Sequence, residues 1–132
     1  MFCREQVVQL HHVEDRISAA GVGMHVIGNG APMFIAGFRA TTGFDGAIYT
    51  DPDLAVYRAL ALRRGLGTVV RPSVAVAAVR ALRGGFRQGR TQGDPWQQGG
   101  VALVGVDGRV RYKYVARAAG DHPAVAAVLA AL

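Results

Sequence analysis

Residues 101–115 read VALVGVDGRVRYKYV, which is two apolar runs on either side of Asp107-Gly108. Asp-Gly between two such runs is the strongest short signal for a β-hairpin, because it suits a tight turn with positive φ. We therefore predict strands at residues 101–106 and 109–115, paired antiparallel. This hairpin makes the predicted sheet mixed rather than wholly parallel.

The rest of the chain alternates strand and helix signals. Two short apolar runs, at residues 22–27 and 47–50, predict further strands. Gly21 suits a helix C-cap, and Asp51 followed by Pro52 suits a helix start. Helices are predicted at residues 4–20, 33–42, 53–64, 72–82 and 123–132. The order predicts a single α/β domain over residues 1–132, with a mixed sheet flanked by helices.

The composition describes an ordinary globular protein. Of 132 residues, 51% are hydrophobic and 18% charged, and the net charge of +6 comes from 15 basic and 9 acidic side chains. Lys113 is the one lysine among the cations. With the abundant Ala, Val and Gly, this skew toward arginine indicates a GC-rich bacterial coding bias. The positive charge is therefore weak evidence for function.

A single cysteine, Cys3, excludes an internal disulfide and a cysteine-based zinc cage. The apolar runs are too short to cross a bilayer, and no basic-then-apolar signal peptide precedes the first helix. We therefore expect a cytoplasmic protein with no membrane association.

Cys3 stands at the start of the first predicted helix. Unpaired N–H groups and the positive end of the helix dipole stabilise a thiolate there, and Arg4 adds a cation, although Glu5 partly opposes it. This pattern predicts a lowered thiol pKa and attack on peroxide or disulfide sulfur. The alternative interpretation is a small apolar residue near a frayed terminus.

Several short segments stand in the order seen in one known family. They are Phe2-Cys3-Arg4-Glu5, Gly84-Gly85-Phe86, Gly99-Gly100-Val101 and Gly120-Asp121, with Asp51 after the second strand. In these segments the chain resembles the peroxiredoxin-like branch of the AhpC/TSA family, which includes selenoprotein U-like proteins. The resemblance implies a thioredoxin-like fold that lacks its first strand.

The resemblance also implies a site. The family commonly carries a CxxC motif, in which Cys3 corresponds to the second cysteine and the first would lie before Met1. Cys3 would be the redox thiol, Arg4 its electrostatic support, and Gly99-Gly100 would take the place of a cis-proline loop facing the cysteine. The implied activity is peroxide or disulfide reduction, with no metal or organic cofactor and with a thiol reductant such as thioredoxin or glutathione. The Pro and Thr that precede the cysteine in peroxiredoxins proper are missing.

Two other functions stay open. A thioredoxin-like sheet without its central strand would have unpaired edges, so the chain could be a non-catalytic interaction module that borrows a strand from a partner or from a second copy, as a homodimer. Alternatively, the Arg-rich stretch at residues 58–90 could bind nucleic acid or another anion, since no acidic residue occurs between Leu54 and Gly93. No helix-turn-helix or stacking-aromatic pattern accompanies that charge, which favours a solvated face over nucleic-acid binding.

Two further motifs are weaker. His11 and His12 are adjacent, so on a helix they point about 100° apart and cannot share one metal from one face. Gly28-Asn29-Gly30 resembles the start of a phosphate-binding turn, but the next glycine of that motif is replaced by Met33. We interpret it as a plain turn between strand and helix.

Overall fold

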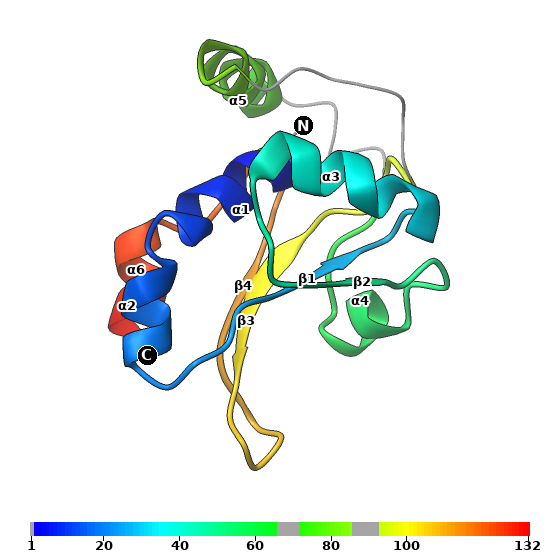
Figure 1. The fold of residues 1–132 in the computed structure, drawn as a ribbon. Helices are drawn as coiled ribbons and strands as arrows, with labels where there is room; N and C mark the ends of the chain where they lie inside the picture. Colours follow the sequence, from blue (N-terminus) through cyan, green and yellow to red (C-terminus); the bar gives the residue numbers. More distant parts are fainter. Residues whose placement is uncertain (1, 66–71, 86–92) are drawn as a thin grey trace.

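The predicted hairpin is present in the computed structural model, which describes residues 2–65, 72–85 and 93–132 (Figure 1). Strand β3 (Gly100–Val104) pairs antiparallel with β4 (Val110–Val115), and the register is irregular after Leu103. Gly108 adopts φ 77°, a left-handed conformation that a side chain would oppose. The Asp107-Gly108 turn therefore forms as its sequence predicts.

The other two strands form a parallel pair. Strand β1 (His25–Gly28) pairs with β2 (Ala47–Thr50), with His25 opposite Ala47. Among the described residues no ladder joins β1 to β3, so the predicted mixed sheet is observed as two two-stranded pieces. The described residues hold no strand ahead of the first helix, which is where the resemblance puts the central strand. The combination of parallel and antiparallel pairs agrees with the predicted mixed α/β class.

The first predicted helix is two helices, so the single helix predicted at residues 4–20 is wrong. Helix α1 (Phe2–His11) and helix α2 (Glu14–Ala19) are separated at Val13, whose φ of −115° and ψ of 15° leave the helical region. A hydrogen bond of 2.5 Å between His11 Nδ1 and Glu14 Oε2 spans the break. Gly21, at φ 76°, ends α2 as predicted.

The next two helices are positioned by their ends. A short 3₁₀ turn, η1 (Pro32–Phe34), leads into α3 (Ile35–Thr42), which ends at Gly43 with φ 72°. Helix α4 (Ala55–Ala59) is much shorter than the predicted 53–64.

Backbone conformation limits α4 on both sides. Leu54 and Ala61 have φ values of 58° and 53°, which no α-helix contains. The Asp51 carboxylate still accepts hydrogen bonds from the N–H groups of Ala55 and Val56, at 2.9 and 2.8 Å, as expected of a capping side chain, but Leu54 and not Asp51 occupies the N-cap position.

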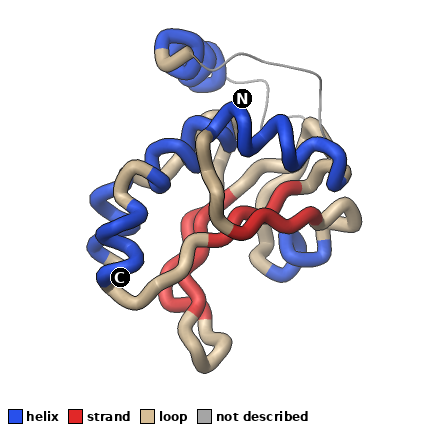
Figure 2. Tube along the Cα trace, in the orientation of Figure 1, coloured by secondary structure: helices blue, strands red, loops and turns tan. Residues whose placement is uncertain are grey.

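Two helices complete the chain, α5 (Pro72–Arg83) and α6 (Val125–Ala130). Helices α1 and α3 pack together on one side of the strands, and α4 lies on the other side (Figures 1 and 2). The buried apolar side chains come chiefly from the helices and loops: Val7, Leu10, Ile17, Phe44, Ala77, Ala81, Ala116, Ala118 and Val128. None of the helices in the described residues is long and apolar enough to cross a bilayer.

Candidate active site around Cys3

Cys3 lies in the first turn of α1 and is exposed to solvent as a residue. Its sulfur faces the loop that precedes β3, because a Cβ placed on Gly99 would lie 3.8 Å from Cys3 Sγ. The carbonyl oxygen of Gly99 accepts a 3.1 Å hydrogen bond from the N–H of Ala116, which ties this loop to the end of β4. The structure thus brings Cys3 and Gly99 together, as the resemblance implies.

Gly100, next to Gly99, is required by close packing against β4 rather than by the thiol. A Cβ at this position would lie 2.4 Å from the Tyr114 carbonyl oxygen and 2.8 Å from Leu62 Cδ2. At this position the backbone of β3 passes too close to β4 for any side chain. Gly100 therefore sets the position of the strand, whereas Gly99 leaves room beside the thiol.

Tyr57 of α4 is a neighbour of Cys3 that the sequence did not indicate. Its hydroxyl donates a 3.0 Å hydrogen bond to the carbonyl oxygen of Ile27, at the end of β1. Burial raises the pKa of Tyr57 far above its ordinary value, and the negative charges of an ionised Cys3 and of Asp51 raise it further. The phenol therefore stays protonated, with its proton directed at β1. The predicted helix start at Asp51-Pro52 was the sequence signal that pointed to this helix.

The predicted lowering of the thiol pKa is wrong. Burial is the largest influence and raises the pKa of Cys3 above its ordinary value, although a backbone hydrogen bond and the Arg4 guanidinium each lower it. The residue as a whole is exposed, but protein atoms surround its sulfur. This burial disfavours the charged thiolate. At neutral pH the thiol form predominates.

Arg4 makes a further contact away from the sulfur. Its guanidinium lies 5.9 Å from the centroid of the Phe38 ring on α3, within the range of a cation–π interaction. Arg4 therefore packs α1 against α3, and its charge acts on Cys3 in the expected direction but does not outweigh burial.

Glu5 is a buried carboxylate two residues from Cys3, with its side chain 6% exposed. Arg80 Nε of α5 donates to Glu5 Oε1 at 2.8 Å, and Arg80 Nη2 donates to the Gly120 carbonyl oxygen at 2.8 Å. His122 Nε2 lies 3.8 Å from Glu5 Oε2. These contacts fix α1, and with it Cys3, to α5 and to the loop at Gly120.

The arginines at residues 58–90 are partly engaged within the protein. Besides the Arg80 contacts, Arg64 pairs with Asp94 at 2.5 Å and Arg58 donates to the Asp53 carbonyl oxygen at 2.6 Å. Arg71, Arg87 and Arg90 lie outside the described residues. Because ion pairs neutralise Arg64 and Arg80, fewer cations remain for the alternative in which this stretch binds an anion.

The Gly28-Asn29-Gly30 turn also makes internal contacts. Asn29 Nδ2 donates to the Asp94 carbonyl oxygen at 3.1 Å, and a Cβ on Gly93 would meet Asn29 O at 2.5 Å. The turn packs closely against the loop at residues 93–96. This agrees with its interpretation as a plain turn between strand and helix.

Known proteins resemble this chain over most of its length. The family described as AhpC/TSA antioxidant enzyme matches residues 9–118. A chloroplastic protein of Arabidopsis thaliana, named thioredoxin-like protein AAED1, is 30% identical over 141 residues, covering 99% of this chain and 56% of its own length. Proteins named peroxiredoxin-like 2C are 28% identical in Bos taurus and 27% identical in Homo sapiens, each covering 96% of this chain.

These matches cover only part of each relative. The chain spans 56% to 61% of the length of these three relatives, and the family match begins after Cys3. No solved structure matches the chain. The relatives are eukaryotic, so a bacterial origin stays a prediction from composition.

Proposed function

Because the chain belongs to the AhpC/TSA antioxidant enzyme family, which has a thioredoxin-like fold, we propose that it is a thiol-dependent oxidoreductase that reduces peroxides or disulfides through Cys3. The supporting observation is the placement of Cys3, an exposed residue in the first turn of α1 whose sulfur faces the small Gly99 position. A substrate oxygen or sulfur can approach the thiol beside this residue. The names of the relatives, peroxiredoxin-like and thioredoxin-like, agree with this class of chemistry.

The proposed peroxide reaction has two stages. The Cys3 thiolate attacks one peroxide oxygen, the O–O bond breaks, and the alkoxide or hydroxide that leaves takes a proton, so that Cys3 becomes a sulfenic acid. A small thiol or a protein thiol then displaces water from the sulfenic sulfur to give a mixed disulfide. A second thiol reduces this disulfide and regenerates Cys3.

The electrostatics of the site set its pH dependence. Because burial raises the pKa of the Cys3 thiol, the reactive thiolate is a minor form at neutral pH and its fraction increases with pH. Free thiols persist most readily in a reducing compartment, so the single cysteine agrees with the cytoplasmic location that is part of the proposal.

The test compares the unmodified chain with Cys3→Ser for peroxide consumption in the presence of thioredoxin or glutathione. Serine preserves size and polarity but cannot form a sulfenic acid. We expect consumption above the rate of the reductant alone with Cys3, and none with Cys3→Ser. Equal rates would remove Cys3 from the mechanism.

A second candidate function rests on the separate strand pairs. Among the described residues, β1 pairs with β2 alone and β3 pairs with β4 alone. An edge of this kind can accept a strand from a second copy or from a partner. If the chain is such an interaction module, light scattering should show a dimer, and Cys3→Ser should form it equally well. A monomer at high protein concentration would exclude the homodimer.

A further inference from the structure

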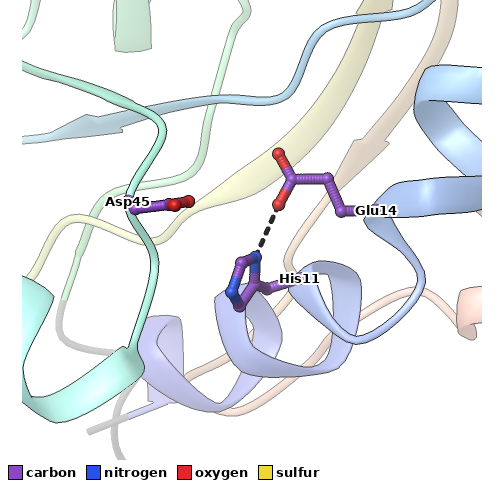
Figure 3. Close-up of side chains that lie close together, drawn as sticks. All are labelled: His11, Glu14 and Asp45. Atoms are coloured by element: carbon purple, nitrogen blue, oxygen red, sulfur yellow. Dashed lines mark hydrogen bonds and ion pairs between the residues drawn. The ribbon is translucent and has the colours of Figure 1, made fainter.

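His11, Glu14 and Asp45 converge on one point at the surface, on the opposite end of α1 from Cys3 (Figure 3). One ligand atom from each side chain lies within 4.8 Å of the other two. His11 and Glu14 come from the break between α1 and α2, and Asp45 comes from the loop between α3 and β2. This cluster was not predicted from the sequence, because the spacing of His11 and His12 excludes a shared metal and Asp45 is distant along the chain.

We propose that these three side chains form a binding site for one divalent transition-metal ion, with Zn²⁺ as the ion of best fit. One imidazole and two carboxylates are ligand types that zinc takes, and their two negative charges match the charge of the ion. The imidazole disfavours magnesium and calcium, which prefer oxygen ligands alone.

The loop that carries Asp45 is held firmly. Phe44 is 1% exposed, and the His11 ring meets its ring edge-on at a centroid distance of 5.6 Å. Arg39 Nη1 donates to the carbonyl oxygens on both sides of Asp45, at 3.2 Å to Phe44 and 2.8 Å to Gly46. The imidazole and the Asp45 backbone are therefore positioned by the same buried ring, which lowers the entropic cost of bringing the ligands together.

The distances require a small adjustment on binding. Donor atoms in a tetrahedral zinc site are about 3.4 Å apart, given bonds of about 2.1 Å. His11 Nδ1 and Glu14 Oε2 are now 2.5 Å apart and hydrogen-bonded, so the ion would replace this hydrogen bond and separate the two atoms by about 1 Å. Asp45 is exposed and its side chain can rotate toward the ion. Three protein ligands would leave the remaining position to water.

Calorimetric titration of the metal-free 132-residue chain with ZnCl₂ tests the proposal. The chain carries Cys3→Ser, so that the thiol cannot bind the ion and the result is independent of the proposed redox function. We expect one Zn²⁺ per chain and a higher melting temperature in its presence, because the ion links the α1–α2 break to the loop at Asp45. No binding, or equal binding of Mg²⁺, would overturn the proposal.

Variants locate the bound ion. Asp45→Asn and Glu14→Gln should each weaken Zn²⁺ binding by about tenfold or more. Removing even a residue that only hydrogen-bonds to a metal ligand lowers metal affinity by about tenfold. The matched controls are His12→Ala and Asp15→Asn, which change exposed neighbours of the site. They should alter the affinity by less than about threefold, as expected for surface charges. Equal weakening by Asp15→Asn would show general attraction to an acidic surface and refute the site.

Discussion

Replacing Arg80 by leucine removes the cation that neutralises the buried Glu5 carboxylate. The change deletes the 2.8 Å contact between Arg80 Nε and Glu5 Oε1 and the 2.8 Å contact with the Gly120 carbonyl oxygen. Breaking a buried ion pair costs about 3–5 kcal/mol because one charge stays desolvated. The Arg80 side chain is 51% exposed, and His122 still lies 3.8 Å from the carboxylate. We therefore expect a smaller loss in the free energy of unfolding, about 2–3 kcal/mol.

Urea unfolding of matched variants measures this loss. Arg83→Leu is the control, since Arg83 lies in the same last turn of α5 and is exposed, and it should cost less than about 0.5 kcal/mol. Adding Glu5→Gln to Arg80→Leu removes the stranded charge and should recover about 1 kcal/mol or more. If Arg80→Leu and Arg83→Leu unfold at the same urea concentration, Glu5 does not depend on Arg80 and the reasoning is refuted.

The remaining predictions concern the thiol and its loop. Alkylation of Cys3 by iodoacetamide should rise about tenfold per pH unit between about pH 7 and 8.5, because its pKa is raised, and a plateau below about pH 8 would contradict this. Arg4→Gln should slow alkylation at neutral pH by no more than about fivefold, since Arg4 is only half-buried and a charge near the surface contributes up to about 1 kcal/mol, and a larger fall would make Arg4 the dominant influence. Gly100→Ala should destabilise the fold by about 1–3 kcal/mol in thermal unfolding, because its methyl group meets the β4 backbone. Gly99→Ala is its control and should cost far less, so equal losses would contradict the assigned positions.

Elements set by local chemistry were predictable from the sequence. Strand β2 has the predicted bounds, and Gly21 ends α2 in the left-handed conformation expected of it. In these places a glycine or an apolar run decides the backbone by itself. Helix α4 was predicted too long because Leu54 and Ala61 have positive φ, which their side chains disfavour and no local pattern indicates.

Contacts between distant parts of the chain were not predictable in this way. Arg80 and Glu5 are 75 residues apart, and the periodicity of α5 shows that the helix has two faces but not which element each face meets. The contact between Cys3 and Gly99 was expected from the resemblance alone. Tyr57 beside Cys3, and Asp45 beside His11, follow from packing that no spacing encodes.

The thiol pKa shows how such packing can reverse a local prediction. A charge at a helix terminus gains about 0.3–1 kcal/mol, which is less than one pKa unit. Desolvation shifts the pKa of a fully buried group by about 3–5 units, so even partial burial exceeds the dipole and Arg4 together. The folded chain thus holds the Cys3 proton more tightly than the unfolded chain, and the free energy of unfolding falls as the pH rises above the ordinary thiol pKa. Because burial outweighs Arg4 in setting the pKa of Cys3, changes to the protein atoms around the sulfur should alter its reactivity more than any change to Arg4.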